Sequence, residues 1–481
     1  MTSTFFTILQ IYTSLILTPS INVVYPRPMG NDSISYIAKV DSNFIFGSVM
    51  PSDARLLVNE IEFDVEENGT FLAFVPLDWE KKRYELIAIH NNDSAVLTLP
   101  FNAYNTSQKQ ERSKLSFPRL IELTGGVART DPQGAYYIFP ESGTIVVTEE
   151  YKQGYFKIRL SNGRAVWIMA KYVKDVGQIE NLPTPVMMYG TVKPSGKWVD
   201  IVMPVGRKVL YRTWEITNPD KIFIELYNVI SHIDRIAYTP GTDLVREVIW
   251  DQPEDSVVRL EILLSQPSWG YKVEWEADDL ILKVRRPPKL KCGVKGLNIV
   301  IDPGHGDKDL GAVGSTGLTE KEINLKVALE LGSYLMRKGA KVILTRYNDS
   351  FIELKDRTLF AEKVEADILI SLHHNALPDG VNPFGNYGTG TYYYRPQSRL
   401  LAECMQKELV KKLRFPDEGV YYNNLALVRT TAMPSVLIEA AYMMLPKQEA
   451  EMLDDKYPKK LTKAIYKGLR GFVKQSKKAR K

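Results

Sequence analysis

The sequence contains few cysteines and few histidines. Only two cysteines, Cys292 and Cys404, occur in 481 residues. This number excludes a disulfide framework and a cysteine-based metal site. Five histidines occur, and three of them, His305, His373 and His374, lie in one C-terminal segment. Chemistry that depends on histidine is therefore concentrated there.

The chain also lacks a strong charge and a long apolar run. Its net charge of +5 is small for this length. A small positive charge is compatible with an anionic polymer as partner, but no basic footprint typical of nucleic-acid binding is present, so we expect no nucleic-acid partner. No stretch is apolar for long enough to form a membrane helix, and we expect no integral membrane span.

The N-terminus has the only run of signal-peptide character. Residues 5–17 are apolar over a length that is too short to span a bilayer comfortably. We therefore assign residues 1–24 to a probable signal segment and expect an exported protein of the periplasm or cell envelope. No basic residue precedes Arg27 and no clear cleavage site follows. A buried first strand remains the alternative interpretation.

Three β-rich modules are predicted before a change of character near Cys292. Short strands separated by turns predict a small all-β sandwich over residues 25–115, a compact β-barrel over 116–180 and a β-sandwich over 181–290. These modules resemble, respectively, the immunoglobulin-like modules of secreted bacterial enzymes, bacterial Src-homology-like barrels and the β-sandwich targeting domains of envelope proteins. Barrels of this kind often bind cell-wall peptide, although aromatic residues on alternating strands are as easily explained as core.

From residue 291 to 475, strand and helix patterns alternate, and a basic tail follows over residues 476–481. This alternation predicts an α/β domain with a mostly parallel, twisted sheet and helices on both faces. We expect a final helix from Lys459 to about Val473. The basic residues Arg285 to Lys289 are expected to form a stiff linker before this domain.

Three potential metal ligands converge at the carboxyl ends of the predicted strands. His305 follows the strand 297–302, His373 closes the strand 368–372, and Glu320 begins the helix after the His305 loop. Ligands in open α/β sheets bind beyond this edge. Two imidazoles and one carboxylate with an open fourth position describe a catalytic Zn²⁺ site, for one ion. Glu439 ends the apolar strand 435–438 and is positioned to act as general base.

Each candidate has a plainer interpretation. His305 could simply tolerate a glycine-rich turn, and Glu439 could be an ion-pair partner of Arg346 or Arg429. Glu322 is expected to serve a capping box with Thr319, which leaves Glu320 free. Alternation along the strand sends the side chains of His373 and His374 to opposite sides, so only one of them is expected to reach the metal.

The C-terminal domain resembles the zinc-dependent N-acetylmuramoyl-L-alanine amidases of bacterial cell walls. The matching motifs, in the order in which this family has them, are Ile301-Asp302-Pro303-Gly304-His305-Gly306, Gly317-Leu318-Thr319-Glu320-Lys321, Thr345-Arg346, Ser371-Leu372-His373-His374-Asn375-Ala376 and Met433-Pro434-Ser435-Val436-Leu437-Ile438-Glu439. The resemblance implies that His305, Glu320 and His373 hold zinc and that Glu439 is the catalytic acid/base. It also implies hydrolysis of the amide between N-acetylmuramic acid and L-alanine, with peptidoglycan as substrate.

Further expectations concern substrate contacts, access to the site, partners and rival functions. Arg429 and Asn375 are secondary candidates for contacting substrate or orienting the metal site. Some relatives carry a helix that plugs the site, but here only a loop rich in proline, glycine and asparagine, residues 377–390, follows the second histidine, so we expect no such helix. An envelope activator protein is a possible further partner. The rival functions are a zinc peptidase that trims peptidoglycan stem peptides and a non-catalytic cell-wall-binding scaffold.

Overall fold

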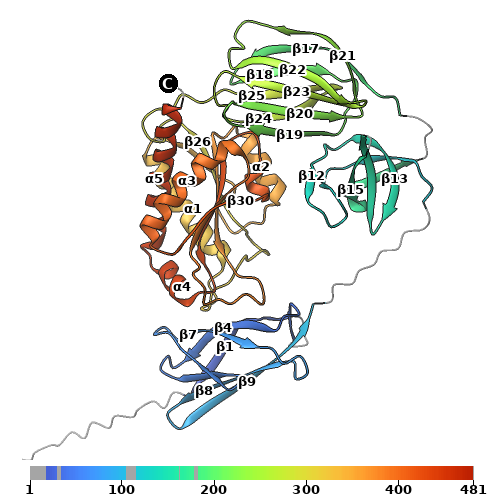
Figure 1. Cartoon of the computed structure of the whole chain (residues 1–481). Helices are drawn as coiled ribbons and strands as arrows, with labels where there is room; N and C mark the ends of the chain where they lie inside the picture. Colours follow the sequence, from blue (N-terminus) through green and yellow to red (C-terminus); the bar gives the residue numbers. More distant parts are fainter. Residues whose placement is uncertain (1–17, 30–33, 105–114, 162, 178–181, 480–481) are drawn as a thin grey trace, which may run out of the picture.

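A computed structural model describes residues 18–29, 34–104, 115–161, 163–177 and 182–479 (Figure 1). Three β-rich modules precede a C-terminal α/β domain in the chain. The apolar run at residues 5–17, on which the predicted signal segment rests, lies outside the described residues. Within the described ranges, no helix is both long enough and apolar enough to cross a membrane.

The first module consists of two sheets that enclose one apolar core. One sheet has the order β1-β4-β7 and the other has the order β2-β3-β9-β8-β5-β6. The strands are β1 (Ser20–Tyr25), β2 (Pro28–Met29), β3 (Ile34–Ile37), β4 (Ser42–Met50), β5 (Arg55–Val58), β6 (Ile61–Phe63), β7 (Thr70–Pro76), β8 (Arg83–His90) and β9 (Asp93–Ala103). Because β1 pairs with β4, the module includes Ser20 and so begins earlier than the predicted boundary at residue 25.

The second module is a single antiparallel sheet of seven short strands in the order β12-β11-β15-β14-β13-β10-β16. Alternating apolar residues turn inward along β14, for example Phe156, Ile158 and Leu160. Its elements are β10 (Arg119–Leu123), β11 (Ala128–Arg129), β12 (Tyr136–Ile138), β13 (Thr144–Lys152), β14 (Tyr155–Ser161), β15 (Arg164–Met169), η2 (Ala170–Tyr172) and β16 (Val173–Gly177).

The third module is a sandwich of two sheets, with the orders β21-β17-β18-β25-β24 and β19-β20-β23-β22. Their facing sides form one apolar core. The strands are β17 (Val186–Ser195), β18 (Trp198–Pro204), β19 (Tyr211–Ile216), β20 (Lys221–Tyr227), β21 (Ile230–Tyr238), β22 (Val245–Glu254), β23 (Val257–Leu264), β24 (Tyr271–Glu276) and β25 (Asp279–Arg285).

The C-terminal domain contains a six-stranded sheet in the order β27-β26-β28-β31-β29-β30. All neighbouring strands are parallel except β29 and β31, which are antiparallel. The strands are β26 (Asn298–Pro303), β27 (Lys341–Leu344), β28 (Ile368–Asn375), β29 (Thr389–Tyr393), β30 (Asp417–Tyr422) and β31 (Ser435–Tyr442). The helices are α1 (Glu320–Arg337), α2 (Leu354–Lys363), α3 (Pro396–Leu413), η3 (Ala426–Val428), α4 (Pro446–Leu453) and α5 (Tyr457–Lys478).

Helices cover both faces of this sheet, as the alternating pattern predicted. Apolar residues of α1, α3 and α5 pack on one face in the largest core of the molecule. Residues of α2 and η3 pack on the other face, against Val300 and Leu369. Helix α5 continues to Lys478, beyond the predicted end near Val473, because Phe472, Val473 and Ser476 are still buried.

The third module is fixed to the C-terminal domain by a buried arginine. The Arg285 side chain donates to Asp367 Oδ1 at 2.8 Å and to the Glu365 carbonyl at 3.0 Å. The Trp269 indole donates to the Asp367 carbonyl at 2.7 Å. The predicted stiff linker from Arg285 to Lys289 is therefore wrong at its first residue, since Arg285 ends β25, is 1% exposed and belongs to the interface.

Candidate metal centre and catalytic edge

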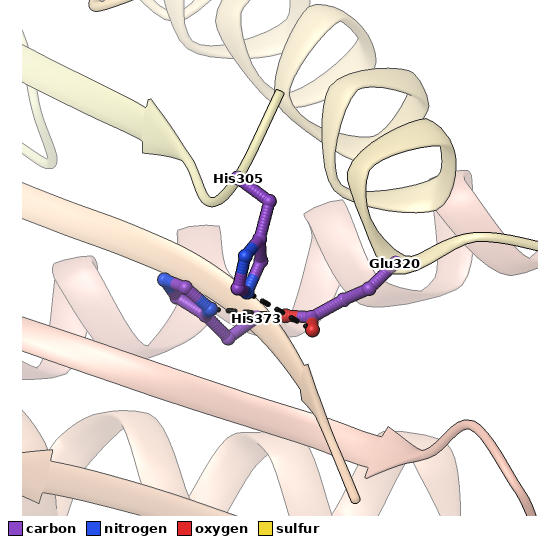
Figure 2. Close-up of side chains that lie close together, drawn as sticks. All are labelled: His305, Glu320 and His373. Carbon is purple, nitrogen blue, oxygen red and sulfur yellow. Dashed lines mark hydrogen bonds and ion pairs between the residues drawn. The ribbon is translucent and has the colours of Figure 1, made fainter. Parts of the chain in front are cut away.

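Three side chains from separate elements meet at the carboxyl edge of the sheet. His305 lies just after β26, Glu320 is the first residue of α1, and His373 lies in β28. Glu320 Oε2 is 3.0 Å from His305 Nε2, and Glu320 Oε1 is 2.9 Å from His373 Nδ1 (Figure 2). One potential ligand atom from each residue lies within 4.8 Å of the other two. The structure thus brings together the three residues that the sequence suggested as ligands.

The donor set and its spacing fit a zinc ion. Two ligand atoms bound about 2.0–2.1 Å from a tetrahedral Zn²⁺ lie roughly 3.3 Å apart. The two histidine–glutamate distances of 3.0 and 2.9 Å are near this value, and the three ligand atoms together lie within 4.8 Å. Burial raises the pKa of Glu320, but hydrogen bonds and charge interactions with the two histidines lower it well below its usual range. A charged carboxylate between two imidazoles in a mostly buried pocket is the electrostatic setting that a divalent cation prefers.

Helix α1 begins in a way that presents Glu320 to this pocket. Thr319 and Glu322 form the predicted capping box, in which the Thr319 backbone N–H donates to the Glu322 carboxylate at 3.0 Å. Glu322 is therefore used at the helix start, whereas Glu320 is 4% exposed and points inward. Its carboxylate also accepts from the backbone N–H of Ala312 at 2.9 Å and of His374 at 3.1 Å.

Two glycines allow the ligands to approach the backbone closely. A Cβ atom on Gly304 would lie 2.2 Å from Cε1 and 2.5 Å from Nε2 of His373. A Cβ atom on Gly311 would lie 2.5 Å from Glu320 Oε2 and 2.7 Å from His305 Cδ2. These glycines are therefore required by space, because any side chain would push a metal-site residue away.

Two buried arginines hold the loop that carries His305. Arg357 donates to the carbonyls of Pro303 and His305, both at 2.9 Å, and to Asp302 Oδ1 at 3.0 Å. Arg346 donates to the carbonyls of Pro303 at 3.0 Å and Gly304 at 2.9 Å. His305 has a φ of 63°, which is unusual for a residue with a side chain. These donors stabilise that conformation, so Arg346 serves the backbone of the loop.

Asp309 and Arg357 are functional residues that the sequence interpretation missed. Asp309 Oδ1 lies 2.9 Å from His305 Nδ1, the ring nitrogen that faces away from Glu320. The pair does not have hydrogen-bond geometry here, but a carboxylate beside the distal nitrogen of a metal-binding histidine can orient the ring. Its position four residues after His305 in the same loop was the available signal. Arg357 had no such signal, because only the fold brings α2 beneath the loop.

His374 points away from the metal site, as strand alternation predicted. It is 1% exposed, its Nδ1 lies 2.8 Å from Asn324 Oδ1, and its Nε2 lies 2.9 Å from the Tyr457 hydroxyl. Burial lowers the pKa of His374 to about 4. It is therefore a neutral core histidine that links β28 to α1 and α5.

Glu439 lies on β31 in register with His373 on the parallel strand β28. Residues in register on parallel strands share a face of the sheet, so both side chains face the same side. The Glu439 Oε2 atom is buried and has no hydrogen-bond partner. Burial, and then the negative charges of Glu320 and Glu418, raise the pKa of Glu439 well above its usual range. No ion pair to Arg346 or Arg429 is seen among the described residues, so the plainer interpretation of Glu439 is not supported.

The two secondary candidates lie in different places. Asn375 ends β28, close to Tyr392, whose pKa burial and the nearby Glu439 raise to about 12. Asn375 is therefore at the catalytic edge. Arg429 precedes β31, at the opposite edge of the sheet, where its guanidinium lies 4.2 Å from the ring centroid of Phe139. The expectation that Arg429 lies near the metal is wrong, because β31 carries the chain across the sheet between Arg429 and Glu439.

The first module packs against the loops that follow the catalytic-edge residues (Figure 1). Phe44 and Phe46 belong to an apolar cluster that includes Met444, with Val313 and Leu377 packed against it. The segment 377–388 contains no helix, in agreement with the expectation of a site without a plugging helix.

A partly buried polar contact accompanies this packing. The Asp379 carboxylate accepts from the backbone N–H of Ala38 at 2.7 Å, from Asn43 Nδ2 at 3.1 Å and from the Tyr25 hydroxyl. The Asn43 side chain in turn accepts from the Gly380 backbone N–H at 3.1 Å. The first module therefore supports the loop after His373 directly.

A mostly parallel α/β sheet with a His–Glu–His cluster and an unpaired carboxylate at its carboxyl edge is the architecture of a metallohydrolase. Residues 299–471 match the family model described as N-acetylmuramoyl-L-alanine amidase. The chain is also 32% identical over 206 residues to the probable cell wall amidase LytH of Staphylococcus saprophyticus, covering 42% of this chain and 67% of that protein. This chain therefore belongs to the N-acetylmuramoyl-L-alanine amidase family.

Other relatives match over the same domain. N-acetylmuramoyl-L-alanine amidase LytC of Bacillus subtilis is 38% identical over 181 residues, which are 37% of this chain and 36% of LytC. The solved catalytic domain of the amidase CwlV from Bacillus (Paenibacillus) polymyxa var. colistinus is 38% identical and covers 36% of this chain and 95% of that chain, with a TM-score of 0.34. The chain thus spans less than two thirds of LytC and of the LytH of Staphylococcus epidermidis, of which it covers 59%.

Proposed function

We propose that this protein is an exported, zinc-dependent cell-wall hydrolase that cleaves the amide bond between N-acetylmuramic acid and L-alanine in peptidoglycan. The observation that carries the proposal is the convergence of His305, Glu320 and His373 within 4.8 Å, beside the unpartnered carboxylate of Glu439. Family membership supplies the substrate class. The names of relatives such as LytC and LytH support a place in the cell envelope.

The residues divide the chemistry between binding and proton transfer. His305, Glu320 and His373 would hold Zn²⁺, which when bound polarises a carbonyl and lowers the pKa of a water to about 7. Glu439 takes a proton from the attacking water and delivers it to the leaving nitrogen of L-alanine. Its buried position and raised pKa suit a carboxylate that must accept a proton near neutral pH. Asp309 would orient His305, and Asn375 lies at the same edge, where β28 ends.

We infer further that the three leading modules place this domain on its polymer. Their strand patterns support the likeness to an immunoglobulin-like sandwich, a bacterial Src-homology-like barrel and a β-sandwich targeting domain. An envelope activator is a possible partner, and the chain is expected to act without nucleic acid.

Digestion of purified peptidoglycan by the full chain tests the proposal. We expect mass analysis to find free stem peptides with an exposed alanine amine and glycan strands without peptide. The variant Glu439→Gln, which is nearly isosteric, is expected to lower the rate by at least roughly a hundredfold. Stems shortened at their carboxyl ends would support the rival zinc peptidase instead. Intact peptidoglycan after treatment with the zinc-loaded chain would support the non-catalytic scaffold.

A further inference from the structure

A cavity lies where the second module, the third module and the C-terminal domain meet. Its volume is about 830 Å³, within the range of roughly 300–1,000 Å³ that is typical of small-molecule sites. It is lined at the C-terminal domain by Tyr394 and Arg395, which follow β29, and by Thr431, which precedes β31. Because β29 and β31 are antiparallel, this is the edge of the sheet opposite to Glu439. The cavity is therefore separate from the metal site.

Three guanidinium groups, those of Arg212, Arg395 and Arg429, line this cavity and lie against aromatic rings. Arg212 lies 4.5 Å from the ring centroid of Tyr137 and 5.5 Å from that of Trp214. Arg429 lies 4.2 Å from the centroid of Phe139 and donates to Asn424 Oδ1 at 2.7 Å. In the described part of the chain, neither the Arg212 nor the Arg429 guanidinium has a carboxylate within ion-pair distance. Both guanidiniums are thus held in place without a direct ion pair, although five carboxylates also line the cavity, those of Glu141, Glu215, Glu274, Glu276 and Glu362.

The cavity lining also includes residues with unsatisfied polar atoms. The Glu215 side chain is 9% exposed, and its Oε2 accepts from the Tyr271 hydroxyl at 2.8 Å and lies 3.6 Å from Arg395 Nη1. Its other oxygen, Oε1, is buried without a hydrogen-bond partner, as is the indole nitrogen of Trp275. Both residues line the cavity. Buried polar atoms without a partner are rare in native proteins and carry a free-energy cost, which a ligand would remove.

These groups together define the chemistry of a complementary ligand. Planar guanidiniums recognise carboxylates, often through two parallel hydrogen bonds. The Glu215 oxygen requires an N–H donor, and the Trp275 indole requires an acceptor such as a carbonyl. A peptide with free carboxylates offers all three groups, because its backbone supplies amide N–H groups and carbonyls. The aromatic walls suit its aliphatic parts.

We propose that this cavity binds the stem peptide of peptidoglycan through its free carboxylates, at a site distinct from the metal centre. The identity of the peptide rests on the proposed function, whereas the carboxylate-binding chemistry rests on the cavity alone. The second module, the third module and the C-terminal domain all contribute to the cavity, so it exists only when they are docked. A second stem-peptide site on the opposite edge of the catalytic sheet keeps the enzyme attached to the wall between cleavage events.

Calorimetric titration of the full chain tests this site. The probe is the synthetic peptide L-alanyl-γ-D-glutamyl-L-lysine with free carboxylates, compared with the same peptide after amidation of its carboxylates. We expect the free peptide to bind and amidation to weaken binding by roughly tenfold or more, because the charge-assisted hydrogen bonds are lost. Arg212→Ala and Arg429→Ala should each weaken binding to a similar extent. Arg399→Ala is the control, since Arg399 is exposed on α3 and pairs with Glu403.

Two further variants separate this site from the catalytic edge and from misfolding. His373→Ala alters the metal centre and should leave peptide affinity unchanged. Trp275→Phe removes the indole N–H together with the five-membered ring, so it should weaken binding, and the thermal unfolding midpoint measured beside it separates loss of this donor from misfolding. The proposal is overturned if the free peptide does not bind, if the cavity variants bind it as the wild type does, or if His373→Ala abolishes binding. Each of these results leaves the peptidoglycan digestion experiment, and hence the proposed function, to stand or fall separately.

Discussion

Replacing Gly304 by alanine should displace the His373 ring, although all three metal-binding residues stay unchanged. The added Cβ would lie 2.2 to 2.7 Å from three atoms of the His373 ring, whereas ordinary contacts begin near 3.4 Å. The ring therefore has to move by more than about 1 Å. Gly304 does not have a positive φ, so its backbone accepts alanine and the effect is steric. Misplacement of this size lowers reaction rates by about a hundredfold, and disturbed metal ligation lowers metal affinity by about 10–100-fold.

The assay is competition for Zn²⁺ against a fluorescent chelator, together with the rate of stem-peptide release. Gly471→Ala in α5 is the matched control, because the nearest atom to its added Cβ is Cys404 Sγ at 3.5 Å. That helical replacement should leave zinc affinity and rate unchanged and stabilise the fold by roughly 0.5–1 kcal/mol. If Gly304→Ala bound zinc and cleaved peptidoglycan as well as wild type, the placement of His373 at the metal would be refuted.

Three further perturbations probe the surroundings of the site. Asp309→Ala should lower zinc affinity by roughly tenfold or more, because His305 loses its orienting carboxylate, and unchanged affinity in the chelator assay would rule out that role. Arg357→Met should destabilise the domain by about 3–5 kcal/mol, since Asp302 is left buried without its cation, and denaturant unfolding measures this loss. Asp379→Ala should cost about 1–3 kcal/mol and expose the first module to protease, whereas Glu62→Ala on the surface should leave stability and protease resistance unchanged. Equal protease resistance of these last two variants would contradict the docking role of Asp379.

The candidate metal site could be predicted largely from local patterns. A β-branched run that stops at Pro303-Gly304 places His305 beyond a strand end, and the capping box at Thr319 leaves Glu320 free to point inward. Strand alternation separated His373 from His374 correctly. Each of these inferences depends on local backbone geometry, which is determined by residues close together in the sequence. They can therefore be made without knowledge of the fold.

Contacts between distant elements could not be predicted in this way. Arg357 reaches the His305 loop only because α2 packs beneath β26, and no spacing in the sequence indicates this contact. Arg429 was a candidate for contacting substrate near the metal, but β31 carries Arg429 and Glu439 to opposite edges of the sheet. The extension of α5 to Lys478 was missed because basic residues dominate its last turns, although residues up to Ser476 are buried on one face of the helix. The docking of one module on another depends on the shapes of their surfaces, which leave little periodic pattern in the sequence.

Zinc titration of the metal-free full chain is the most direct test of the central claim, that three side chains from separate elements share one ion. We predict that wild type binds one Zn²⁺ per chain by metal analysis. His373→Ala should lose this binding, and Glu439→Gln should keep the zinc while releasing almost no stem peptide. A wild-type chain that binds no stoichiometric zinc, or a His373→Ala variant that binds it with unchanged affinity, would contradict the account.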